Sequence, residues 1–173
     1  MQGTQARVLA LPGRRGMRPS AQDGRPGGSL MFDPSRQDVR RFFCDLWRRH
    51  REGLPLTPLE TIALERVLAH PEYHDDLADE EAALAAEYPV EAGRGNPFLH
   101  LSMHLAIAEQ LSIDQPPGLR AAHARLAQRL DSTHEADHQV MECLGEVIWR
   151  AQRDNAPPDG HAYLECVERR ARG

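Results

Sequence analysis

Apolar residues recur at intervals of three or four along the chain from Met31 onward, the spacing of helices that each bury one face. The clearest stripe occupies five positions near the start of this segment: Val39, Phe42, Phe43, Leu46 and Trp47. No segment alternates β-branched and polar residues, as a half-buried strand would. The pattern therefore predicts an all-α fold, a single bundle of about six helices.

Capping residues and prolines divide this segment into helices. A capping box at Thr57 and Glu60 marks one helix start, and Asn96 and Ser132 are the N-caps of two others. Pro71 interrupts the second helix or begins a new one. The predicted helices cover residues 34 to about 53, 58–70, 79–88, 97–112, 118–130, 133–153 and a last segment after 159.

The first 30 residues differ from the rest of the chain. They contain five Arg and a single acidic residue, Asp23, and no apolar period runs through them. They also lack the apolar stretch of a secretory signal. We expect residues 1–30 to be a disordered tail, produced by a start site assigned upstream of the true start at Met31, and residues 31–173 to be the helical domain. A basic arm for nucleic acid is the less favoured alternative.

Charge and composition narrow the class of protein. The chain has 173 residues and a net charge of −5, and the part beyond residue 30, with 16 Arg and 25 acidic residues, has a net charge of −9. No stretch approaches the roughly 20 apolar residues of a membrane span. Three Cys without a CxxC pair indicate neither a disulfide framework nor a four-Cys zinc site. We therefore expect a cytoplasmic protein that binds neither membranes nor nucleic acid, and leave homo-oligomerisation open.

Histidine is over-represented in this chain. The chain has nine His, where average usage of roughly 2% would give about four. Six of them form three pairs spaced four residues apart: His70 and His74, His100 and His104, and His134 and His138. Residues at this spacing lie one turn apart on one helix face, so two imidazoles can converge on one ion. We expect the first pair to be solvent-facing caps, because Pro71 separates its members.

Helical projection places the other two pairs toward the protein interior. His100 and His104 fall inside the apolar arc of their helix, and His134 and His138 lie at the edge of another arc, on the face of Glu142. Burying several unpartnered imidazoles costs on the order of 1–3 kcal/mol each, and a divalent metal removes that cost. We therefore predict a metal site, with these candidate ligands: His100, His104, His134, His138, Glu142 and Glu135.

Several chemistries fit this ligand set. Zinc or iron is favoured, and haem held by two His is less favoured. A ferritin-like di-iron site needs two Glu-x-x-His pairs, whereas only Glu135 with His138 has this spacing. The string HEADH at 134–138 matches a metalloprotease motif, but it begins in the first turn of its helix and lacks that class's sheet. Whether the protein is an enzyme stays open.

Two interpretations without a metal are also open. The inward histidines, with His123 as a hydrogen-bonded core residue, can form a structural hydrogen-bond network in a non-catalytic interaction or scaffold protein. Alternatively, the acidic helical domain can bind a basic partner.

The segment from Met31 to about Arg170 resembles a family of small bacterial proteins known as domain of unknown function 1841. The resemblance rests on LTPLE at 56–60, HPEY at 70–73, NPFLHLSMHLAIAEQ at 96–110 and HEADHQVMECLGE at 134–146, and begins at the MFDPSR that follows residue 30. It implies no activity that could be transferred to this chain.

Overall fold

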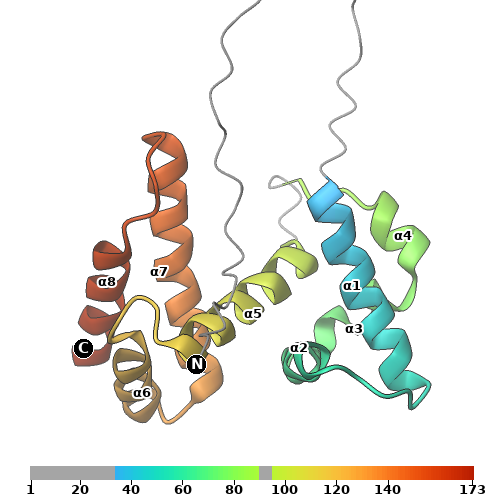
Figure 1. Cartoon of the computed structure of the whole chain (residues 1–173), viewed down its shortest axis with the longest axis horizontal. Helices are drawn as coiled ribbons and strands as arrows, with labels where there is room; N and C mark the ends of the chain where they lie inside the picture. The colour runs from blue at the N-terminus through green and yellow to red at the C-terminus, as the bar shows by residue number, and fades with distance from the viewer. Residues whose placement is uncertain (1–33, 90–94) are drawn as a thin grey trace, which may run out of the picture. The chain divides into compact units, whose positions relative to one another are not determined.

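A computed structural model describes residues 34–89 and 95–173 of the chain. These residues form helices, turns and loops, so the predicted all-α fold is confirmed for the described part (Figure 1). The elements are α1 (Pro34–Arg51), α2 (Pro58–Leu68), the 3-10 helix η1 (Pro71–Tyr73), α3 (His74–Ala78), α4 (Glu80–Ala85), α5 (Pro97–Ile113), α6 (Leu119–Leu130), α7 (Thr133–Arg153) and α8 (Gly160–Arg172). None of these helices has the length and apolarity needed to cross a membrane. The tail predicted at residues 1–30 lies outside the described residues.

The helices begin where the capping residues predict. The Thr57 hydroxyl accepts a hydrogen bond from the backbone amide of Glu60, and the Glu60 carboxylate accepts one from the backbone amide of Thr57. These two bonds complete the predicted capping box of α2. Asn96 caps α5, and Ser132 caps α7 through the amide of Glu135. These caps fix the starts of α2, α5 and α7, the helices that position the histidines discussed below.

The described part has more helices than the expected six or so, because the segment after α2 divides into short pieces. Pro71 cannot continue α2, so the chain turns through η1 into α3. Asp79 then adopts an extended backbone conformation and caps α4 through the amide of Ala82. Three short helical elements thus stand where the sequence predicted a break or new start at Pro71 and one short helix at 79–88.

The helices pack around two hydrophobic clusters, a division that the sequence did not predict. Helices α1 to α5 enclose the first cluster, which includes Phe43, Leu46 and Leu101. Helices α5 to α8 enclose the second, which includes Ile107 and Val140. Helix α5 serves both clusters because Leu101 and Ile107 are six residues apart, which at about 100° per residue turns their side chains well away from each other.

The cysteines differ from the sequence expectation. Cys143 of α7 and Cys166 of α8 form a disulfide across the second cluster, and Cys44 is free and buried in the first. The sequence indicated no disulfide framework and did not predict this pair, because a separation of 23 residues does not reveal that two packed helices bring these side chains together. A reducing, cytoplasmic location therefore loses the support that unpaired cysteines gave it and stays a prediction.

Candidate metal centre

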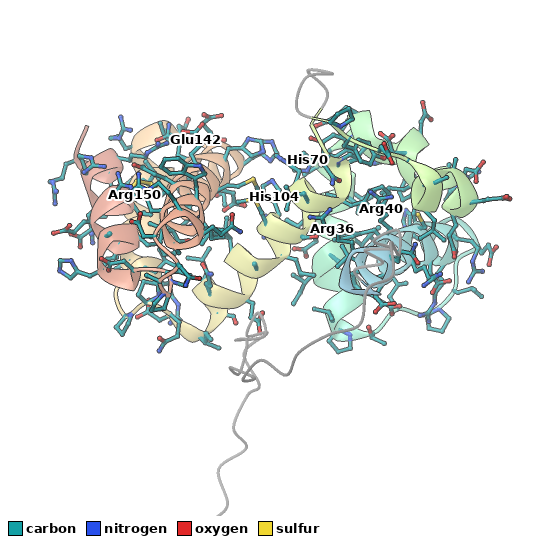
Figure 2. All side chains as sticks on the ribbon, turned by 90° about the horizontal axis from the view of Figure 1, so that it is seen from above. Arg36, Arg40, His70, His104, Glu142 and Arg150 are labelled. Carbon is teal, nitrogen blue, oxygen red and sulfur yellow. A yellow bond between two sulfur atoms is a disulfide. The ribbon has the colours of Figure 1, made fainter. Side chains whose placement is uncertain are left out.

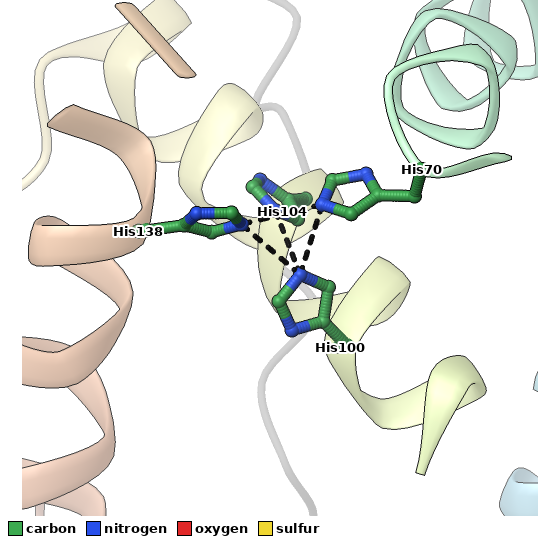
Figure 3. A group of neighbouring side chains, drawn as sticks. All are labelled: His70, His100, His104 and His138. Carbon is green, nitrogen blue, oxygen red and sulfur yellow. Dashed lines mark hydrogen bonds between the residues drawn. The ribbon is translucent and has the colours of Figure 1, made fainter. Parts of the chain in front are cut away.

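Four histidines from three parts of the chain point their rings toward one another (Figure 3). His70 is the N-cap of η1, directly after α2. His100 and His104 lie one turn apart on α5, and His138 lies on α7. Since α2 packs on the first hydrophobic cluster and α7 on the second, the group lies where the helices of the two clusters meet.

The four rings present the same atom to a common centre. The Nε2 atom of His100 lies 3.0 Å from that of His70, 3.2 Å from that of His104 and 3.2 Å from that of His138. The Nε2 atoms of His70 and His138 are 3.2 Å apart. The four ligand nitrogens all lie within 4.8 Å of one another. This convergence brings together side chains that are up to 68 positions apart in the sequence.

Hydrogen bonds between the rings cannot account for this arrangement. A neutral imidazole nitrogen either donates one N–H or accepts through one lone pair, so His100 Nε2 cannot satisfy three nitrogen neighbours. The Nδ1 atom of His70 lies 2.7 Å from the carbonyl oxygen of Arg66 and must donate to it, which leaves Nε2 of a neutral His70 with a lone pair. The Nδ1 atom of His104 is buried and, within the described residues, has no hydrogen-bond partner.

A metal ion satisfies the same four atoms at once. Four imidazoles around a tetrahedral ion, with metal–nitrogen bonds of about 2.1 Å, place their nitrogens roughly 3.4 Å apart. The observed separations of 3.0–3.2 Å between neighbouring Nε2 atoms need to widen by only a few tenths of an ångström to match. The donor set and its spacing therefore fit a bound cation.

Burial keeps His100, His104 and His138 neutral, as metal ligation requires. His70 and His104 are 2% and 1% exposed, whereas His100 and His138 are half-buried. Burial, assisted by the neighbouring histidines, lowers the pKa of His100 to about 4 and that of His104 to about 3. The pKa of His138 is also lowered, first by burial and then by His134 and His70. Their lone pairs are thus available to a cation near neutral pH.

A buried carboxylate, Asp137, interacts with residues next to the four-histidine group. Asp137, next to His138 on α7, accepts hydrogen bonds of 2.7 Å from Arg66 of α2 and from His123 of α6. Burial acts to raise the pKa of Asp137, but the His123 hydrogen bond and the Arg66 charge outweigh it, so this pKa is lowered. Because Arg66 also supplies the carbonyl that orients His70, one residue links the carboxylate to a ligand ring.

The structure brings together three of the six candidate ligands, His100, His104 and His138. His134 is exposed beside them, its ring centroid 4.3 Å from that of His138. Glu142 instead pairs with Arg170 of α8, and Glu135 is exposed on the first turn of α7. Figure 2 shows Glu142 over the C-terminal helices, away from His70 and His104.

The expectation for the first histidine pair was wrong. His70 does occupy the N-cap position of η1, but it is buried within the four-histidine group rather than facing solvent. Pro71 does separate it from His74, whose ring stacks on Trp47 and whose Nε2 lies 2.9 Å from the carbonyl of Val67. Pro71 was the sequence signal for this position of His70. Because a proline cannot continue α2, His70 lies outside that helix and its ring can point toward the interior. His123 is a hydrogen-bonded, largely buried residue, as expected.

Together the fold and the site define an all-α protein with a four-histidine group that can hold a metal ion. The family model described as a domain of unknown function (DUF1841) matches residues 35–169, and the chain belongs to this family. No curated protein and no solved structure shows a significant match to the chain.

Proposed function

We propose that this protein binds one transition-metal ion through the Nε2 atoms of its four-histidine group: His70, His100, His104 and His138. The observation that carries the proposal is the contact of His100 Nε2 with three other Nε2 atoms at 3.0–3.2 Å. Only a cation can accept four such lone pairs at one point. The alternative of a structural hydrogen-bond network is not favoured, because it leaves these Nε2 contacts unsatisfied.

The donor set selects the metal. Imidazole suits zinc, copper, iron and nickel, and four protein ligands in a tetrahedron are typical of zinc. Non-haem iron sites commonly include a carboxylate, whereas the group found in the described residues consists of imidazoles alone. A haem would have to lie between two of the nitrogens, whose separations of 3.0–3.2 Å leave no room for a porphyrin. Zinc is therefore the proposed ion.

The ion's proposed role is to join the two halves of the helical domain. His70 follows α2 on the first hydrophobic cluster, His138 lies on α7 against the second, and His100 and His104 lie on the helix that serves both. A site whose four positions are all filled by protein side chains is typical of structural zinc rather than of catalytic zinc. Zinc binding is then linked to the folding of the domain.

The proposal is tested with untagged protein, since a His-tag would bind the same metals. Elemental analysis should find about one zinc per chain, and metal-free protein should bind one equivalent of cobalt with the visible absorption of a tetrahedral complex. His104→Gln should abolish the cobalt absorption, whereas His161→Gln, which removes an exposed imidazole from α8, should leave it unchanged. Wild-type protein that binds no stoichiometric metal would overturn the proposal.

A further inference from the structure

A fifth imidazole lies beside the four-histidine group on its exposed side. His134 is on the first turn of α7, one turn before His138, and its side chain is exposed. Its ring centroid lies 4.3 Å from that of His138, 5.0 Å from that of His70 and 6.1 Å from that of His104. His134 is nevertheless outside the set of nitrogens that converge on one point.

Exposure increases from the centre of this cluster outward. His70 and His104 are almost completely buried, His138 is half-buried, and His134 is in solvent. A cation that reaches the group must shed its water ligands, and it does so more easily when protein donors replace them one at a time. Because His134 contacts the rings of two members, it is placed to hold an incoming ion while the inner rings take over.

Two exposed carboxylates flank the same ligands. Glu72 of η1 and Glu135 of α7 are exposed. Glu72 lies two residues after His70, and Glu135 lies next to His134 and one helical turn before His138. Each carboxylate is thus within three residues of a member of the group along the chain, and its negative charge attracts cations.

We propose that His134, assisted by Glu72 and Glu135, forms an outer loading site through which the metal ion enters and leaves the four-histidine group. The ligand class is a hydrated divalent transition-metal ion, held briefly by an imidazole and carboxylate oxygens. This inference rests on the proposed function, and assigns His134 a kinetic role rather than a place among the final ligands.

The kinetic role has a distinctive signature. A loading site lowers the barrier between free and bound metal in both directions by the same amount, so it speeds binding and release equally. Removing it therefore changes both rate constants and leaves their ratio, the dissociation constant, unchanged. Removing a final ligand instead weakens the equilibrium affinity and alters the metal's coordination.

The experiment is a stopped-flow measurement with cobalt as the probe, on metal-free full-length protein. Binding is followed by the cobalt absorption, and release by displacement with excess EDTA. We expect His134→Ala to slow both rates about 10-fold, which is within the range over which association rates differ among variants of one site. The dissociation constant and the final spectrum should be unchanged. Glu135→Gln should slow binding and release by the same, smaller factor. His161→Ala, an exposed imidazole on α8, should match wild type.

The outcomes separate this inference from the proposed function. Wild-type protein that binds no cobalt would refute the metal site itself. If wild type binds cobalt and His134→Ala does so at wild-type rates, the loading site is refuted while the four-histidine site stands. If His134→Ala weakens affinity more than 10-fold and changes the final spectrum, His134 is a fifth ligand and the loading role is again wrong. Circular dichroism of each variant checks that its helices are intact.

Discussion

Replacing His104 by leucine should change the stability of this protein in opposite directions with and without zinc. His104 is 1% exposed, and its Nδ1 has no hydrogen-bond partner in the described residues. An unsatisfied buried polar atom costs about 1–3 kcal/mol, and leucine, similar in size, removes it. Allowing for imperfect packing, we expect the metal-free variant to be about 1 kcal/mol more stable than the metal-free wild type.

Excess zinc should reverse this order of stability between the variant and the wild type. A ligand present at 1,000 times its dissociation constant stabilises the folded state by about 4 kcal/mol. The His104→Leu variant loses one of four ligands and with it most of this gain. In excess zinc the variant should therefore be roughly 3 kcal/mol less stable than wild type, the linked gain minus the relief of the buried nitrogen.

The assay is guanidinium unfolding followed by far-ultraviolet circular dichroism, with EDTA in one series and excess zinc in the other. His161→Leu on α8 is the control for replacing an imidazole by leucine, because its side chain is 81% exposed and outside the group. A change of the same sign and size in both series would refute the reasoning, since the role of His104 would then be independent of metal.

Three further predictions concern the buried carboxylate, the lowered histidine pKa values and the disulfide. Asp137→Leu removes the buried partner of Arg66 and His123 and should lower the free energy of unfolding by about 3–5 kcal/mol. Glu142→Leu loses a more exposed pair with Arg170 and should lower it by under about 1 kcal/mol. Denaturant unfolding compares the two variants, and equal effects would contradict the buried network. The metal-free protein should lose stability as the pH falls from about 7 to about 4. His100 and His104 take up protons near pH 6.5 in the unfolded chain, but in the folded protein their pKa values are about 4 and about 3. A free energy of unfolding that stays constant across this range would contradict the lowered pKa values. Cys143→Ala should lower the free energy of unfolding by about 3 kcal/mol, the chain-entropy value for a closed loop of this length. For the wild type, a denaturant unfolding midpoint that is the same with and without reductant would contradict the disulfide.

Local signals in the sequence were sufficient for most of the fold. The caps at Thr57, Asn96 and Ser132 are each determined by residues within three positions, so the starts of α2, α5 and α7 could be predicted. The division of the core could not, because it depends on which helices α5 packs against on each of its faces. The pairing of Cys143 with Cys166 depends in the same way on how α7 packs against α8.

The candidate site was predicted in part for the same reason. His100, His104 and His138 lie on regular helices, where projection shows which side chains face the interior. His70 follows the end of α2, where helical projection no longer applies, so its inward direction was missed. Glu142 lies on a suitable face of α7, but Arg170 of α8 takes its carboxylate, an interaction between distant segments that no local pattern reveals.

X-ray absorption spectroscopy at the zinc edge tests the central claim most directly, because it reports the atoms bound to the ion. For zinc-loaded, untagged protein we predict a single shell of four nitrogen ligands at about 2.0–2.1 Å, with the outer-shell scattering of imidazole rings. His134→Ala should give the same spectrum. A shell containing sulfur at about 2.3 Å, or one with fewer than three imidazoles, would contradict a site built from His70, His100, His104 and His138.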